Sequence, residues 1–296
     1  MPVPYPDIHV DEVIVRALLA EQFSDLSGLE LRHAAEGFDN SLWRVGDELV
    51  VRLPRRKAAA ALMEKELKWL PVLAPALPLP ISEPVLVGRQ GPIYPHPWSI
   101  TRWFDGAPAH EAELRDPRGT AEHLASFMNA LHQPAPDDAP SNPFRDTPLA
   151  ARIETFESTL ASLRGAVAES ALREVWEIAL RARPWEGPAV WIHGDLHPLN
   201  LLIDKDELSA VIDFGDLCAG DPATDVASAW MFLAPDVVQT FLGSYRHTDT
   251  SLVARALGWA ALFGMMFTEI GVDGPAPYAV VGSRTLERVL AFASET

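Results

Sequence analysis

Residues 191–215 read WIHGDLHPLNLLIDKDELSAVIDFG, and this stretch decides which fold we predict. Within 201–212, two apolar runs, Leu-Leu-Ile and Ala-Val-Ile, flank a short polar turn, which is typical of a two-stranded hairpin. A hairpin brings the loop before its first strand close to the residue after its second. We therefore expect Asp195, Asn200 and Asp213 to converge on one small volume. Carboxylate and amide oxygens are the hard ligands that suit Mg²⁺. Of the two carboxylates, one would remain to orient a hydroxyl nucleophile.

The pattern HGDLHPLN followed by DFG resembles the catalytic and metal loops of the protein-kinase-like fold, in which protein kinases carry H-R-D-x-x-x-x-N and D-F-G. Gly194 and His197 are similar instead to the aminoglycoside phosphotransferase and choline kinase-like branch, where H-G-D-x-x-x-x-N is usual. The resemblance covers essentially the whole chain. It implies an α+β protein of two lobes: a nucleotide-binding N-lobe with a small antiparallel sheet over 1–104, and a mainly helical C-lobe over 105–296 for catalysis and acceptor binding.

The charge of the chain bears on its partners. Its 296 residues include 24 Lys and Arg against 41 Asp and Glu, a formal net charge of −17. This excess of acid argues against nucleic acid as a partner, since a phosphate backbone needs a basic surface. It is compatible with a cationic small-molecule acceptor, which a negative cleft would concentrate. Acidity that serves only solubility is an equally good interpretation.

Cellular location follows from cysteine usage and apolar patterning. Cys218 is the single cysteine, which excludes a disulfide within one chain and fits a reducing compartment. No run of about 18 uninterrupted apolar residues occurs, so no membrane span is expected. The first residues lack a basic segment followed by an apolar run, so a signal peptide is not expected either. We predict a cytoplasmic protein.

Strand patterns fill the first third of the chain. Residues 29–55 alternate between apolar and polar and predict a three-stranded antiparallel meander, and 85–104 predicts two more strands. An amphipathic helix over 11–23, with Asp11 as its N-cap, is expected to pack on this lobe. The resemblance implies that the turn 36–41 covers the nucleotide phosphates. Its nucleotide-binding residues would be Gly37, Phe38 and Asn40.

A cation on the third strand that holds the nucleotide phosphates is the next expectation from the resemblance, the alternative being a solvated surface arginine. Arg52 stands where the family usually has lysine, and it can still grip phosphate with two nitrogens. The ending R-x-P-R resembles a branch that includes macrolide phosphotransferases. Residues 57–73 predict a helix, on which Glu66 is expected to pair with Arg52 while Glu64 lies at the surface.

The last strand of the sheet leads into a hinge in this family, where main-chain groups bind adenine. We place the hinge at Arg102, Trp103 and Phe104. Trp103 or Phe104 would wall the adenine pocket, or either would be ordinary core.

The remaining chain is predicted to be helical, with helices over 116–132, 147–163, 169–182, 222–233 and several within 235–293. Between the first two lies the Pro-rich segment 134–148. It would either cover a substrate cleft or serve as a solvated connector, and the second interpretation is slightly favoured.

The resemblance also implies roles for single residues. Asp195 orients the acceptor hydroxyl and accepts its proton, while His193 braces the loop. Asn200 and Asp213 hold Mg²⁺. Asp225, in the sequence GDPATDVA, braces the catalytic loop through its backbone. Acids that could contact substrate are Asp216, Glu269, Asp273 and either Glu154 or Glu157.

Together these features predict transfer of the γ-phosphoryl group of ATP or GTP, with Mg²⁺, to a hydroxyl of a small molecule. An aminoglycoside-type or related antibiotic is the hypothesis for the acceptor. Alternatives are a metabolic kinase for choline, homoserine or a sugar amine, and a non-catalytic nucleotide-binding module. A protein kinase is disfavoured because Gly215 to Asp221 is too short for an activation loop and no A-P-E segment follows.

Overall fold

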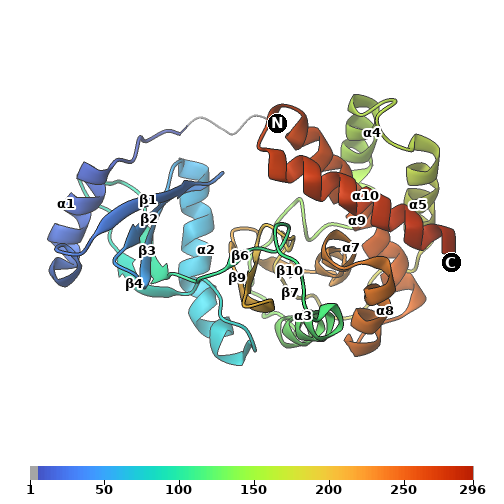
Figure 1. Cartoon of the computed structure of the whole chain (residues 1–296), viewed down its shortest axis with the longest axis horizontal. Helices are drawn as coiled ribbons and strands as arrows, with labels where there is room; N and C mark the ends of the chain where they lie inside the picture. The colour runs from blue at the N-terminus through green and yellow to red at the C-terminus, as the bar shows by residue number, and fades with distance from the viewer. Residues whose placement is uncertain (1–5, 296) are drawn as a thin grey trace.

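A computed structural model describes residues 6–295 of the chain, and Figure 1 shows two lobes joined by a narrow connection. The smaller lobe contains the five-stranded sheet, and the larger lobe is mostly helical. In chain order the elements are α1 Glu12–Gln22, η1 Ser24–Leu26, β1 Leu31–Glu36, β2 Asn40–Val45, β3 Leu49–Pro54, α2 Lys57–Leu73, η2 Ala74–Ala76, β4 Pro84–Gly88, β5 Trp98–Arg102, β6 Ala107–Pro108, α3 Pro117–Leu131, η3 Leu149–Arg152, α4 Ile153–Ser162, α5 Glu169–Arg181, β7 Val190–Ile192, β8 Leu201–Asp204, β9 Glu207–Val211, β10 Cys218–Gly220, α6 Ala223–Val226, α7 Ser228–Phe232, α8 Pro235–Ser244, α9 Thr250–Asp273 and α10 Ala276–Glu295.

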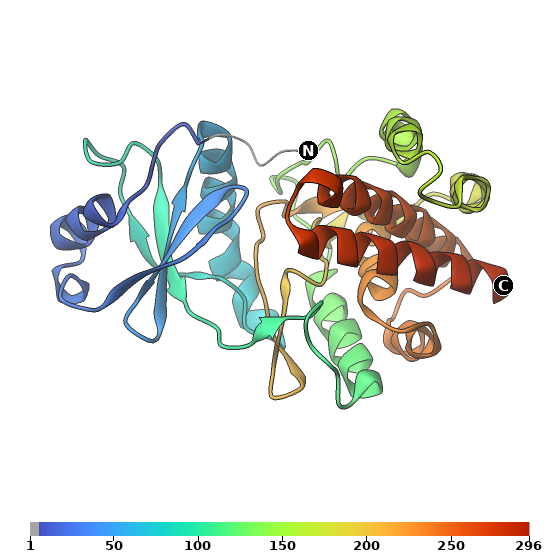
Figure 2. The ribbon, with the colours of Figure 1, turned by 45° about the horizontal axis from the view of Figure 1, so that its top comes forward.

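The small lobe is an antiparallel sheet of strand order β1-β2-β3-β5-β4, so the predicted meander and the two added strands are confirmed. Helices α1 and α2 cover opposite faces of this sheet, and α2 lies on the side of the large lobe (Figures 1 and 2). Asp11 caps α1 by accepting a hydrogen bond from Ile14 N at 2.9 Å. Val15, Leu18 and Leu19 of α1 then join the core of the sheet, because they recur at helical spacing on one face.

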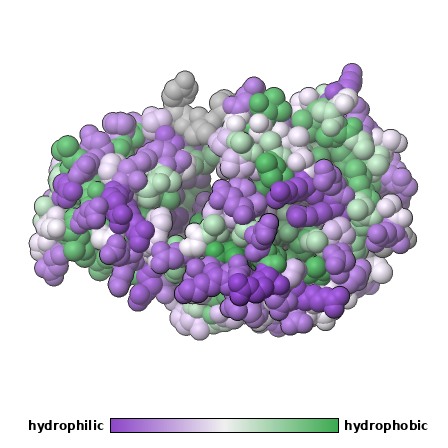
Figure 3. Space-filling view, in the orientation of Figure 1, coloured by the Kyte–Doolittle hydropathy of each residue, from purple (hydrophilic) through white to green (hydrophobic). Residues whose placement is uncertain are grey.

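The large lobe is built around α9. This helix has the length and composition of a membrane span, with a mean hydropathy of 1.4, but 72% of that apolar window is buried inside the protein. It is therefore a core helix that α10, α5 and α4 surround. Figure 3 shows mainly hydrophilic residues on the face in view and a recess between the two lobes.

The predicted hairpin is present as β8 and β9, paired antiparallel from Leu201↔Val211 to Asp204↔Glu207. Its tight turn places Lys205 and Asp206 at φ of 50° and 68°, the left-handed conformation that such turns require. At the open end, Ile212 N donates to Asn200 O at 3.0 Å. The hairpin therefore brings Asn200 next to the residue that precedes Asp213.

Two predicted helices differ in the structure. The helix expected over 147–163 begins as the 3₁₀ turn η3, and regular α4 starts only at Ile153. The helix expected over 222–233 is split into α6 and α7 at Ala227, where Trp230 N bonds to the carbonyl three residues back. At both places the backbone forms i→i+3 turns. An apolar spacing of 3.6 residues in the sequence cannot distinguish such turns from a regular α-helix.

Candidate active site

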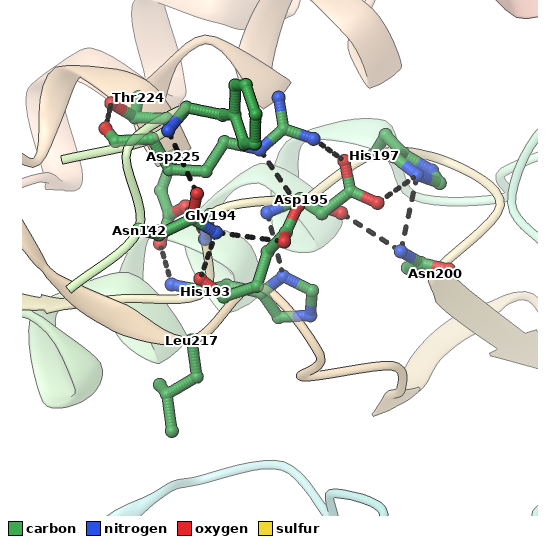
Figure 4. Close-up of polar contacts among 12 residues, drawn as sticks. Asn142, His193, Gly194, Asp195, His197, Asn200, Leu217, Thr224 and Asp225 are labelled. Carbon is green, nitrogen blue, oxygen red and sulfur yellow. Dashed lines mark hydrogen bonds and ion pairs between the residues drawn. The ribbon is translucent and has the colours of Figure 1, made fainter. Parts of the chain in front are cut away.

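The catalytic loop between β7 and β8 holds Asp195 with both carboxylate oxygens in contact with cationic or polar partners (Figure 4). Oδ1 accepts a hydrogen bond from Arg145 Nη2 at 2.9 Å, and Oδ2 lies 3.1 Å from His197 Nε2. The Asp195 main-chain carbonyl accepts from Asn200 Nδ2 at 2.9 Å. The carboxylate is thus oriented from two sides, with 28% of its side chain still exposed for an incoming hydroxyl.

Arg145 bridges two acids of the site. Besides Asp195, its Nε donates to Asp216 Oδ2 at 2.9 Å, and its guanidinium lies 5.0 Å from the centre of the Phe263 ring. Asn142 Nδ2 donates to Asp216 Oδ1 at 2.9 Å. Segment 134–148 therefore reaches the catalytic loop, and the favoured interpretation as a merely solvated connector is wrong. Sequence reasoning missed Arg145 because one arginine in a polar loop has no spacing signal.

The charges around Asp195 shift its protonation equilibrium. Burial alone would raise the pKa of the Asp195 carboxyl, but His197 and Arg145 together lower that pKa well below its ordinary value. Burial would likewise lower the pKa of Arg145, and the carboxylates of Asp195 and Asp216 raise it. Both groups are therefore ionised at neutral pH, and Asp195 is a positioned carboxylate that accepts a proton only weakly by itself.

Asp225 lies beneath the catalytic loop with a fully buried side chain. Its Oδ2 accepts from His193 N at 2.7 Å and lies 3.1 Å from His132 Nε2, and its Oδ1 accepts from Gly194 N at 2.8 Å. Gly194 has φ of +82°, and a Cβ there would lie 2.6 Å from the Asp216 carbonyl oxygen. Only glycine fits this position of the H-G-D motif without displacing the loop.

His193 acts on the backbone of the same loop. Its Nε2 lies 3.0 Å from Ile212 O, and its Nδ1 accepts from Asp195 N at 3.2 Å. The ring thereby links the loop before β8 to the end of β9. The contacts of His193 are those of a bracing residue, and it does not reach the Asp195 carboxylate by any hydrogen bond within residues 6–295.

The two oxygen ligands expected for Mg²⁺ lie at the open end of the hairpin, Asn200 just before β8 and Asp213 shortly after β9. Asn200 donates through Nδ2, so its Oδ1 remains as the ligand atom. Asp213 has φ of 64°, a strained conformation that a non-glycine residue adopts mainly at functional sites. Burial raises the pKa of Asp39, Asp213 and Asp216 raise it further, and Arg56 opposes them. Asp39 and Asp216 are paired with arginines, whereas Asp213 forms no salt bridge among the described residues, so its carboxylate is available to a cation.

Within residues 6–295, no three His, Cys, Asp or Glu side chains gather as a metal site. That result fits Mg²⁺, which uses one or two protein carboxylates and completes its shell with phosphates and water. The donor set of Asn200 and Asp213 is therefore suitable for this ion only together with a nucleotide.

The predicted cation and acid of the small lobe meet in the structure. Arg52 and Glu66 form a bidentate pair through Nη1–Oε2 and Nη2–Oε1, the second contact measuring 3.0 Å. Their side chains are 7% and 4% exposed. Burial raises the pKa of Glu66 and Arg52 opposes that shift, while Glu66 raises the pKa of Arg52 against the effect of burial. With this geometry we treat the pair as ionised. Glu64 is exposed, as predicted.

Replacing Glu66 with glutamine is expected to destabilise the protein by about 3 kcal/mol, because it leaves the buried Arg52 charge without its partner. The KM for nucleotide should rise as well, since Arg52 is then no longer held in one position. Urea unfolding and initial-rate kinetics would measure the two effects. Glu64→Gln is the matched control on the same helix, and equal behaviour of the two variants would contradict a structural role for the pair.

The predicted phosphate-covering turn is held by arginines. Gly37 O accepts from Arg55 Nη1 at 2.8 Å, and Asp39 pairs with Arg56 Nη2 at 2.7 Å. Phe38 is partly buried, and Asn40 opens β2 with its Oδ1 buried and unpartnered among the described residues.

In the hinge, Arg102 ends β5. The Trp103 amide donates to Glu48 O at 2.7 Å, so it is not free for adenine. The Trp103 ring lies 4.6 Å from the Arg44 guanidinium. Of the three predicted hinge residues, Phe104 is the one whose main-chain groups form no hydrogen bond among the described residues and could bind a nucleotide base.

The acids proposed for substrate contact have other partners. Glu157 forms a surface pair with Arg173 at 2.5 Å, and Glu269 accepts from Ser162 Oγ at 2.6 Å. Asp273 is exposed at the end of α9, and Glu154 is exposed in the first turn of α4.

Aromatic residues of α9 and α10 line the same side of the catalytic loop. The ring of Phe267 lies 4.8 Å from that of His197 and 5.3 Å from that of Tyr278. Burial raises the pKa of Tyr278, and the charges of Asp195 and Asp213 raise it further. Neither Phe267 nor Tyr278 was among the residues expected at the site from the sequence.

The comparisons with known proteins agree with this geometry. The profile of the phosphotransferase enzyme family matches residues 30–262. No curated protein sequence matches significantly. Among solved structures, the GDP and kanamycin complex of APH(2")-IIia superposes with a TM-score of 0.70 at 20% identity, over 96% of this chain and 100% of that one. Macrolide 2'-phosphotransferase MphH from Brachybacterium faecium gives 0.62 at 21%, over 92% and 97%. The streptomycin–ATP complex of APH(2")-IIa gives 0.61 at 18%, over 93% and 95%.

Proposed function

Because this chain belongs to the phosphotransferase enzyme family, we propose that it transfers the γ-phosphoryl group of a nucleoside triphosphate to a hydroxyl of a small molecule. The observation that carries the proposal is the convergence of Asp195, Asn200 and the Asp213 loop at the open end of one hairpin. Folds alone host many functions, whereas this constellation matches the needs of phosphoryl transfer.

Each residue has a role that its contacts support. Asp195 accepts a hydrogen bond from the acceptor hydroxyl and orients its oxygen toward the γ-phosphorus. As the new O–P bond forms, the hydroxyl proton passes to this carboxylate, and the bond between the γ-phosphorus and the bridging oxygen breaks so that the nucleoside diphosphate leaves with that electron pair. Arg52, held by Glu66, grips the nucleotide phosphates. Asn200 and Asp213 would hold Mg²⁺, which neutralises phosphate charge when bound. His193 and Asp225 keep the catalytic loop in place.

For the nucleotide we propose a site between the sheet and the hairpin, with residues 37–40 over the phosphates and Phe104 at the adenine or guanine edge. Known structures of this fold contain GDP or ATP, and either base is compatible with recognition through main-chain groups. The boundary between the lobes would then fall at the hinge, after residue 104, as the sequence suggests. A cytoplasmic location, where such nucleotides are abundant, belongs to the same proposal.

For the acceptor we propose an antibiotic-type compound, since kanamycin, streptomycin and macrolides are bound or modified by proteins of this fold. Arg145 neutralises Asp195 and Asp216, so the innermost part of the cleft is not a strongly acidic surface. Phe267 and Tyr278 add aromatic surface beside it. These features favour an acceptor with apolar faces and few amines, such as a macrolide, over a polycation.

A panel of acceptors with labelled ATP and GTP tests the proposal. We expect transfer of the γ-phosphoryl group to at least one macrolide or aminoglycoside, with no transfer by the Asp195→Asn variant. Transfer only to choline, homoserine or a sugar amine would establish the metabolic alternative. Nucleotide binding without any turnover would favour the non-catalytic module.

Replacing Arg145 with alanine is expected to lower kcat roughly 10- to 100-fold, because the Asp195 carboxylate loses one of the two contacts that orient it. The KM for nucleotide should stay unchanged, since Arg145 contacts no residue of the phosphate-binding turn. Arg145→Lys keeps the charge but cannot bridge two carboxylates, so we expect it to recover only part of the loss. Full activity of Arg145→Ala with a well-folded protein would exclude the role.

A further inference from the structure

A second group of basic side chains lies in a cavity of about 210 Å³ outside the catalytic constellation. The lining of the cavity includes the linker between the lobes at Ala109 and His110, the loop before β8 at Pro198, residues 231–234 at the end of α7, and α10 at Arg284 and Arg288. Among the described residues, its walls include none of the side chains assigned above to the nucleotide, the metal or phosphoryl transfer. The roles assigned above involve none of these basic side chains.

His110 is buried in the wall of this cavity and incompletely paired. Its side chain is 8% exposed, and its Nε2 lies 3.3 Å from Glu111 Oε1. Its Nδ1 is buried and has no hydrogen-bond partner within residues 6–295. Buried polar atoms are nearly always satisfied, so an orphaned imidazole nitrogen beside a cavity points to a missing partner.

The two arginines lack acidic partners as well. Arg288 donates through Nη1 to Met231 O at 2.6 Å, and Arg284 donates through Nη1 to His110 O at 3.3 Å. Neither forms an ion pair with any carboxylate in the described part of the chain, although the protein has 41 acids. Burial lowers the pKa of Arg288, Arg284 lowers it further, and Glu287 opposes them. Arg284 is exposed and Arg288 is partly buried, so the charge of Arg288 in particular lies in a partly buried setting without a salt bridge among the described residues.

We propose that this cavity binds a compact oxyanion, either inorganic phosphate or the phosphate group of a small ester, between Arg284, Arg288 and His110. Guanidinium groups present paired N–H donors that match phosphate oxygens, and a ring N–H of His110 can supply a third donor. The volume is below the roughly 300 Å³ at which pockets begin to hold drug-sized ligands, so it suits a phosphate-sized group rather than a nucleotide. The proposal does not depend on the proposed activity.

The location connects this anion site to the catalytic loop. Pro198 lies between His197 and Asn200 in sequence, and Ala109 N donates to Leu201 O at 2.8 Å. An anion bound here would join the linker, the loop and α10, and would remove the repulsion between the two arginines. Binding should therefore stabilise the folded protein by an amount that grows with the logarithm of the phosphate concentration once this exceeds the Kd.

Inorganic phosphate is the probe. It is titrated into the protein and its binding is followed by calorimetry and by NMR of the His110 imidazole. ADP and Mg²⁺ are present at saturating concentrations, so that phosphate does not bind in the proposed nucleotide site. We expect binding that shifts the His110 signals and that Arg284→Ala weakens at least about tenfold. Arg288→Lys, which keeps the charge but not the paired donors, should weaken it too. Arg181→Ala removes one exposed arginine on α5 and is the matched control.

Equal phosphate affinity in wild type and Arg284→Ala, or binding that leaves the His110 signals unchanged, would overturn the site. Glycerol phosphate identifies the source of the anion: tighter binding than inorganic phosphate indicates an ester, and equal or weaker binding indicates the free ion. None of these measurements requires turnover, so failure of the anion site and failure of the proposed activity are separate outcomes.

Discussion

Replacing Asp195 with asparagine is expected to lower kcat by about 10³-fold or more, with little change in the KM for nucleotide. The amide keeps the size of the side chain but cannot accept the hydroxyl proton, and it no longer attracts the cations on either side. The substitution does not change the residues of the small lobe that would position the phosphates. The decrease in kcat should therefore reflect a slower chemical step. Steady-state kinetics with the best acceptor of the panel would measure it.

The Asp195→Asn variant must also be shown to fold and to bind nucleotide. Asp195→Asn leaves Arg145 paired with Asp216, so the protein should remain folded and bind nucleotide. Nucleotide-dependent thermal stabilisation would verify this. A folded Asp195→Asn protein within tenfold of wild-type kcat would contradict the assignment of Asp195 as the residue that orients and deprotonates the hydroxyl.

Replacing Asp225 with alanine is expected to destabilise the protein by about 3–5 kcal/mol and to abolish activity. The change removes the acceptor of two buried backbone N–H groups, those of His193 and Gly194, and the partner of His132. Each buried donor left unsatisfied costs about 1–3 kcal/mol. Because both donors belong to the catalytic loop, the loop should lose its conformation before the rest of the lobe does.

Urea unfolding followed by intrinsic tryptophan fluorescence would measure the loss of stability. Asp225→Asn is the matched variant: one carbonyl oxygen can still accept a hydrogen bond, so a smaller destabilisation is expected. Asp221→Ala gives a further comparison, since that nearby acid pairs with Arg255 and contacts no group of the catalytic loop among the described residues. Similar unfolding of wild type and Asp225→Ala would exclude Asp225 as the support of this loop.

Several features could be predicted from sequence because their signals are local. The hairpin of 201–212 shows as two apolar runs around a polar turn, and each capped helix shows its Asp before the first turn. Arg52 and Glu66 lie 14 residues apart, yet their strand and helix each have clear periodicity, so their pairing could be inferred from the resemblance and is present. Tight 3₁₀ turns at 149 and 227 were missed, because their spacing mimics an α-helix.

The sequence by itself predicted the two-lobed architecture, which the structure confirms, and proposed a catalytic group at 195 and metal ligands at 200 and 213, because all of these depend on local pattern and motif spacing. Only the tertiary structure revealed that Arg145 donates to Asp195, that Phe267 packs between His197 and Tyr278, and that His110, Arg284 and Arg288 share a cavity. Such side chains come from segments 50 to 170 or more residues apart. Their meeting is decided by how α9 and α10 pack on the catalytic loop, which no local periodicity encodes.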